Sequence, residues 1–166
     1  MKRTISILLV LLFASTCISA PFGSAPRRII VLIGDGMGPV HVETMRIVAE
    51  PFHLARIPHR GNVATRSADN GVTDSAAAAT AIATGFKTNN RMVSVDPNGR
   101  RLPTVLEQAA SQGLATGVVT TTSFFDATPA AFTAHARSRA EGTAIVREML
   151  DGPTNVIIGG GAEVFG

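Results

Sequence analysis

Three short polar segments of this 166-residue sequence place oxygen-bearing side chains where a ligand could reach them. Asp35 lies in a glycine-rich segment that follows an apolar run. Asp74 and Ser75 precede a run of alanines, and Asp126 and Thr128 follow a second apolar stretch. Carboxylate and hydroxyl oxygens can hold divalent cations, and a serine hydroxyl can act as a nucleophile when it is activated. The residue types are therefore those of a metal-assisted reaction.

The segment GVTDSAAAATAIATG, residues 71–85, predicts a helix over 75–84 that is closed by Gly85. Alanine is the best helix former, and Asp and Ser are favoured at helix N-caps. A capped, closely packed helix would explain this composition by itself. The alternative is that Ser75 is a nucleophile at a helix N-terminus, where backbone N–H groups favour an anion. Its position in the sequence leaves both interpretations open.

Asp35 allows three interpretations: a turn residue, a metal ligand or part of a nucleotide-binding loop. The glycines at 34, 36 and 38 do not have the spacing of the dinucleotide motif G-x-G-x-x-G. A carboxylate in the middle of such a loop would also repel a pyrophosphate. The sequence therefore favours a ligand of a hard metal or of zinc over a dinucleotide site.

Asp126 and Thr128 belong to an Asp-x-Thr-Pro segment, which is common where a loop enters a helix. Arg139 taken alone would be a solvated surface arginine, and the four scattered histidines form no His-x-x-x-His pair. Taken together, these residues indicate a more specific chemistry. Aspartates and a threonine could hold cations, Ser75 could attack phosphorus, and an arginine could bind two phosphoryl oxygens. These are the parts that metal-assisted phosphoryl transfer needs.

Alternating strands and helices are expected to position these groups. Continuous apolar runs predict buried strands at 29–33, 114–123 and 154–161. Shorter strands are predicted at 61–67 and within 91–102. Helices are predicted after Pro39, over 75–84, over 102–113, after 126 and over 142–152. This order predicts an α/β fold of three layers, a mostly parallel sheet flanked by helices, with ligands at the carboxyl ends of the strands.

Residues 1–25 predict a secretory signal peptide and a loose N-terminus ahead of the domain at 26–166. Lys2 and Arg3 precede an apolar run over 5–14 that is too short for a membrane span. Cleavage is expected between about 17 and 25, which removes the only cysteine, Cys17. Loss of the two basic residues leaves a net charge near +1. With no basic stripe and interleaved aromatics, the composition does not favour nucleic-acid binding.

These motifs resemble the amino-terminal part of alkaline phosphatases. The matching segments are VLIGDGMG, VTDSAAAATAIATGFKTNN, LPTVLEQAASQGLATGVVTTTSFFDATPAAFTAHARSR and VIIGGGAEVFG, which span nearly all of 28–166. The resemblance implies hydrolysis of phosphate monoesters by an exported, periplasmic or extracellular enzyme that is typically a homodimer. It also implies that Ser75 becomes a phosphoserine, that Arg139 binds the substrate phosphate, and that Asp74 positions Arg139.

The resemblance further implies two zinc ions and one magnesium ion. Asp35 would bridge a zinc and the magnesium, Ser75 would contact zinc, Thr128 would bind magnesium directly, and Asp126 would bind it through water. The family's remaining ligands, mostly Asp and His, match nothing after His135. We therefore expect the 166 residues to be the amino-terminal part of a longer enzyme and to be inactive alone.

Two other functions stay open from the sequence. One is a related phosphodiesterase or sulfatase, and these relatives often use a threonine or a modified cysteine as the nucleophile. Ser75 together with Arg139 favours the monoesterase. The other is an exported protein that binds phosphate or metal without catalysis, which the missing ligands leave possible.

Overall fold

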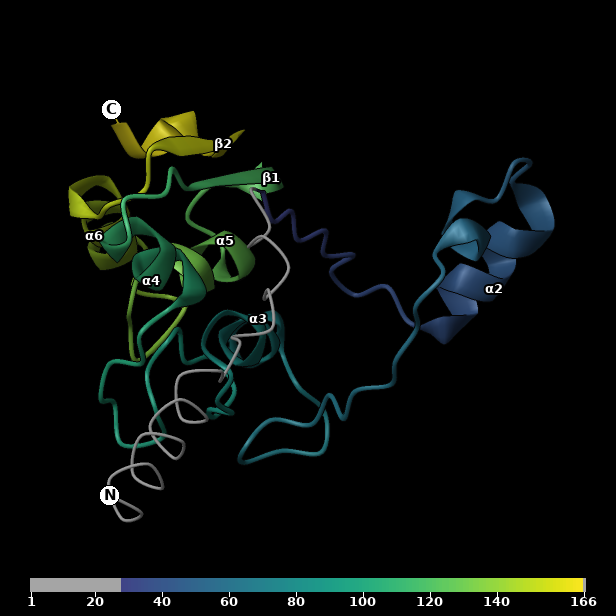
Figure 1. Cartoon of the computed structure of the whole chain (residues 1–166). Helices are drawn as coiled ribbons and strands as arrows, with labels where there is room; N and C mark the ends of the chain where they lie inside the picture. Colours follow the sequence, from purple (N-terminus) through teal and green to yellow (C-terminus); the bar gives the residue numbers. More distant parts are fainter. Residues whose placement is uncertain (1–27, 166) are drawn as a thin grey trace, which may run out of the picture. The chain divides into compact units, whose positions relative to one another are not determined.

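A computed structural model describes residues 28–165, so the predicted signal peptide lies outside the described residues (Figure 1). The chain divides into two units, Met1–Ile33 and Gly34–Gly166. All described helices and strands belong to the second unit. None of the helices within 28–165 is long and apolar enough to cross a membrane.

Two of the predicted strands are wrong. Residues 28–33 have no regular secondary structure, and Leu32 is 91% exposed. Residues 61–67 are also irregular, and all of them except Ser67 are exposed. A strand exists only when a neighbour supplies hydrogen bonds to its backbone, and no pairing is assigned to either segment in the described part. An apolar run predicts burial, but it cannot by itself provide that neighbour.

The core is built around two helices of small residues, α3 (Ser75–Thr84) and α5 (Ala127–Thr133). Alanines buried in both helices let their backbones approach closely, and the two pack against each other. Helix α3 has the predicted bounds and ends at Gly85, whose φ of +80° is the left-handed conformation of a helix C-terminus. The core also contains larger side chains from flanking segments: Val93, Phe124, Ile145 and Met149.

Two further helices flank this core, as predicted. Helix α4 (Val105–Ser111) is shorter than the predicted 102–113 because Thr104 caps it, in a capping box with Glu107. Helix α6 (Gly142–Asp151) is amphipathic and buries Ile145, Val146 and Met149. The remaining helices bury no residue completely: α2 (Pro39–Val48), η1 (His53–Arg56) and η2 (Ala162–Phe165). Of these, η2 packs Val164 against the core.

The described sheet has two parallel strands, β1 (Gly117–Ser123) and β2 (Val156–Gly160), which lie side by side in Figure 1. The connection between them contains α5 and α6, so the predicted parallel strand–helix–strand order is present. The strands are less buried than predicted: Val119 is 73% exposed and Ile158 is 56% exposed. The predicted strand within 91–102 is only two isolated bridges, Val93–Ala136 and Val95–Arg101.

Candidate functional site

The carboxylate of Asp35 joins two hydroxyl groups that are far apart in the sequence. Ser75 donates from Oγ to Oδ1 of Asp35 at 2.8 Å, and Thr128 donates from Oγ1 to Oδ2 at 2.7 Å. Asp35 lies within the turn that the Met37 N–H closes on the Gly34 carbonyl, Ser75 begins α3, and Thr128 lies in the first turn of α5. Three of the predicted site residues therefore meet through one side chain.

The N-terminus of α3 combines a cap with a candidate nucleophile. Asp74 is the N-cap residue, with extended backbone at φ −98°, and its Oδ1 accepts the backbone N–H of Ala77 at 3.0 Å. Ser75 is the first helical residue and is only half-buried. The partial positive charge at a helix N-terminus favours an anion beside the Ser75 hydroxyl. The two interpretations of this segment are thus compatible, because Asp74 caps the helix while the Ser75 hydroxyl belongs to the first helical residue.

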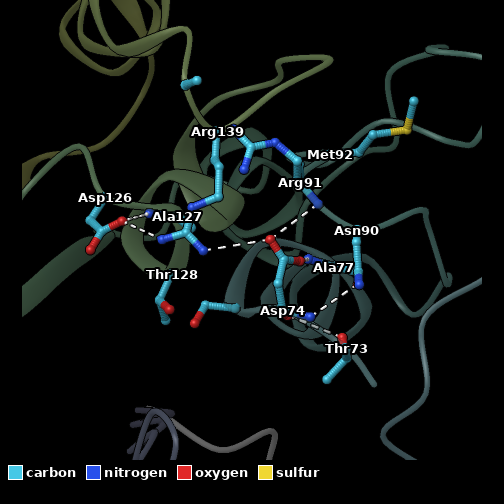
Figure 2. Close-up of polar contacts among 12 residues, drawn as sticks. Thr73, Asp74, Ala77, Asn90, Arg91, Met92, Asp126, Ala127, Thr128 and Arg139 are labelled. Atoms are coloured by element: carbon cyan, nitrogen blue, oxygen red, sulfur yellow. Dashed lines mark hydrogen bonds and ion pairs between the residues drawn. The ribbon is translucent and has the colours of Figure 1, made fainter. Parts of the chain in front are cut away.

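Arg139 lies between two aspartates (Figure 2). Its Nη2 donates to Oδ1 of Asp126 at 2.8 Å, and its Nη1 is 3.5 Å from Oδ2 of Asp74. The Arg139 side chain is 28% exposed, so it is not a solvated surface arginine. The ion pair joins Arg139 to Asp74, whose positioning role stays a prediction. The ion pair with Asp126 was not predicted.

Asp126 is held as a carboxylate by its neighbours. Burial raises its pKa, but the Ala127 N–H and the Arg139 guanidinium outweigh burial, and the pKa is lowered overall. Asp126 also caps α5 by accepting the Ala127 N–H at 2.7 Å, and Thr122 donates to it at 3.2 Å. Asp126 and Thr128, the two predicted magnesium ligands, therefore have different partners. Thr128 bonds to Asp35, whereas Asp126 bonds to Arg139.

Sequence reasoning missed two residues that support this site, Asn90 and Arg91. The side chain of Asn90 accepts the Asp74 N–H at 3.0 Å and donates to the Val72 carbonyl at 2.9 Å. Arg91 uses only its backbone: its N–H donates to Oδ2 of Asp74 at 3.1 Å, and its carbonyl accepts the Arg139 N–H at 2.7 Å. Backbone contacts leave no mark on residue type. The only available signal was that Asn90 ends one of the matching segments.

The oxygen atoms around Asp35 suit magnesium better than zinc. A carboxylate with two hydroxyls is an oxygen-only donor set, as magnesium prefers. A catalytic zinc normally takes three protein ligands. Within residues 28–165 no group of three or more His, Cys, Asp or Glu is placed to hold a metal. The described residues thus fit part of a magnesium site and do not complete a zinc site.

His135 is buried and links two segments of the chain. Its side chain is 2% exposed, and Nδ1 lies 3.2 Å from Oε1 of Glu148. Its Nε2 lies 3.0 Å from the Leu102 carbonyl. These contacts join α6 to the segment before α4.

Comparisons with known proteins agree with this geometry. A family model described as alkaline phosphatase matches residues 26–166. The chain is 37% identical over 155 residues to alkaline phosphatase 4 of Bacillus subtilis, covering 84% of this chain and 34% of that protein. It is 41% identical over 192 residues to streptomycin-6-phosphate phosphatase of Streptomyces griseus, covering 96% of this chain and 42% of that protein. The chain therefore spans well under half the length of these relatives.

The structure is also similar to solved structures. A variant of the alkaline phosphatase from the Antarctic bacterium TAB5, with magnesium bound at a site named M3, superposes with a TM-score of 0.76. The two are 34% identical, and the match covers 78% of this chain and 38% of that one. The predicted α/β fold of three layers is thereby confirmed as the fold of these neighbours, of which the present residues form a part.

Proposed function

Because the chain belongs to the alkaline phosphatase family, we propose that it carries the nucleophile and the phosphate-binding arginine of a phosphate monoesterase. One observation supports this most directly. Ser75 at the N-terminus of α3 is hydrogen-bonded to Asp35, and Arg139 is held at the same helix end by Asp74. Nucleophile, carboxylate and cation are the groups that phosphoryl transfer requires.

In the proposed reaction, Oγ of Ser75 attacks phosphorus and the bond from phosphorus to the ester oxygen breaks. The alcohol leaves with the bonding electron pair and takes up a proton, and the serine becomes a phosphoserine. Water then attacks this phosphorus, releases inorganic phosphate and restores the Ser75 hydroxyl. When bound, divalent cations supply the charge that favours a serine alkoxide and neutralises the phosphoryl oxygens.

The residues of this chain orient that reaction. Asp35 holds the Ser75 hydroxyl through Oδ1 and aligns it at the helix end. Arg139 offers its guanidinium to two phosphoryl oxygens, and the aspartates on its two sides limit its rotation. The Asp35 and Thr128 oxygens would hold magnesium, and Ser75 and Asp35 would contribute to zinc. Asp126 is proposed to reach magnesium through water.

The test is hydrolysis of an aryl phosphate by the full-length protein. Ser75→Ala should lower kcat/KM by at least about a thousandfold, as expected for loss of a nucleophile. Ser111→Ala is the matched control, because that hydroxyl bonds only to the Gln108 carbonyl of its own helix within the described residues. Acid quenching during turnover should show one added phosphoryl group on the peptide that contains Ser75.

The same assay separates the other candidates. Faster hydrolysis of an aryl phosphodiester or sulfate than of the monoester would indicate a relative of different specificity. Phosphate binding without any turnover would indicate a binding protein. Full activity in Ser75→Ala would remove the proposed nucleophile.

Export and assembly complete the proposal. We propose a periplasmic or extracellular enzyme that acts as a homodimer, on the basis of residues 1–25 and of the family. Fractionation of cells, followed by light scattering on the purified protein, tests both. A cytoplasmic protein, or a monomer at assay concentration, would contradict them.

A further inference from the structure

A tight turn at residues 89–92 contacts Asp74 of the candidate site. The Met92 N–H donates to the Asn89 carbonyl at 3.2 Å, and the third residue, Arg91, has a φ of +74°. A positive φ at this position is the geometry of a type II turn, which normally takes glycine or asparagine there. An arginine in this conformation is unusual, since its Cβ makes the left-handed region unfavourable.

The left-handed backbone of Arg91 makes hydrogen bonds to both Asp74 and Arg139. Its N–H donates to Oδ2 of Asp74 at 3.1 Å, the same oxygen that lies 3.5 Å from Nη1 of Arg139. Its carbonyl accepts the backbone N–H of Arg139 at 2.7 Å. One residue thus contacts the carboxylate and the arginine through opposite ends of its own backbone. Figure 2 shows the Arg91 N–H directed at Asp74.

The neighbouring Asn90 fixes the same partner from its side chain. Its Oδ1 accepts the Asp74 N–H at 3.0 Å, so the turn holds both the backbone and the side chain of Asp74. The Arg91 guanidinium, in contrast, makes no hydrogen bond or ion pair with the residues that the structure describes. The contacts of Arg91 to the site are therefore contacts of its backbone.

We propose that Arg91 is a positioning residue. Its left-handed backbone, together with the Asn90 side chain, sets the placement of Arg139 against Asp74 and thereby the affinity of the site for phosphate. This inference rests on the proposed phosphate-binding role of Arg139. It assigns the effect to the backbone conformation and not to the guanidinium charge.

Three substitutions at one position separate backbone from charge. Arg91→Gly and Arg91→Asn remove the guanidinium but accept a positive φ readily, whereas Arg91→Val opposes it because its side chain is β-branched. In the full-length protein, Arg91→Val should weaken binding of inorganic phosphate about tenfold, as strain of the left-handed backbone implies. Arg91→Gly and Arg91→Asn should stay within about twofold of the parent. Titration calorimetry measures the binding without relying on turnover.

The kinetic constants add a readout that a general loss of structure would not give. Arg91→Val should raise KM for an aryl phosphate about as much as it weakens phosphate binding, with a smaller change in kcat. Equal binding in Arg91→Val and Arg91→Gly would overturn the proposal. Equal losses in all three variants would overturn it as well, by assigning the effect to the guanidinium.

A second position keeps the test decisive if Arg91→Val does not fold. Asn90→Ala removes the acceptor for the Asp74 N–H, and Asn89→Ala is the control in the same turn. Weaker phosphate binding in Asn90→Ala than in Asn89→Ala supports the proposal, and equal binding overturns it. A parent protein that binds phosphate but hydrolyses no monoester would instead contradict the proposed function and leave this comparison valid.

Discussion

Ser75 donates a hydrogen bond of 2.8 Å from Oγ to Oδ1 of Asp35, which precedes it by 40 residues. The other oxygen of the same carboxylate accepts the Thr128 hydroxyl at 2.7 Å. A glycine-flanked loop, the start of α3 and the start of α5 therefore share one carboxylate. Both oxygens of the Asp35 carboxylate accept a hydrogen bond, so a substitution of Asp35 should affect the position of Ser75 and of Thr128.

Asp35→Asn should remove the charge at nearly constant shape. We expect activity of the full-length protein toward an aryl phosphate to fall at least about a hundredfold, because an amide is a poor cation ligand. The melting temperature should change little, since Asp35 is exposed. Asp151→Asn, at an exposed aspartate outside the site, is the control. Activity of Asp35→Asn equal to that of the control would exclude a role for this charge.

Asp74→Ala should damage both helix stability and phosphate binding. Loss of an N-cap acceptor costs about 1 kcal/mol of unfolding free energy, and Arg139 also loses one of its two partners. Asp74→Ser keeps a capping oxygen but not the ion pair, so it should recover stability without recovering KM. Urea unfolding and Michaelis kinetics on both variants check this. Recovery of both properties by serine would refute the positioning role of Asp74.

Asp126 should make the folded state sensitive to acid. Its pKa is lower in the folded protein than in the unfolded chain, so its stabilising contribution is complete above the unfolded pKa. That contribution is lost as the pH falls through the folded pKa, below about pH 4. The difference in unfolding free energy between parent and Asp126→Asn should therefore be constant near neutrality and shrink toward about pH 3. A difference that grows with acidity would contradict this sign.

The buried face of α3 should tolerate no larger side chain at Ala77. Ala77 is 2% exposed, whereas Ala78 is only half-buried. Overpacking a filled core costs about 1–3 kcal/mol, so Ala77→Leu should lower the unfolding free energy by that amount. Ala78→Leu, the matched change one residue along, should cost less. Thermal unfolding of the two variants compares them, and equal stability would show that small residues are not needed there.

Sequence alone was sufficient for the bounds of α3 because the determinants of this helix are local. The helix begins after the Asp74 cap, continues through a run rich in alanine, the best helix former, and ends at Gly85. All of these residues are close together in the sequence. The segments that contain Asp35, Ser75 and Arg139 resemble those of alkaline phosphatases, and the family model and relatives confirm that family. The catalytic roles of these residues stay predictions.

Tertiary structure decided what depends on distant partners. The strands predicted at 29–33 and 61–67 are wrong because pairing needs a neighbour that no apolar pattern contains. The separation of Asp126 from Thr128, one bound to Arg139 and the other to Asp35, follows from the packing of α5. The role inferred for Arg91 could not be predicted from the sequence for a simpler reason. Its contacts come from backbone N–H and carbonyl groups, which every residue except proline possesses, and only the folded chain determines where they point.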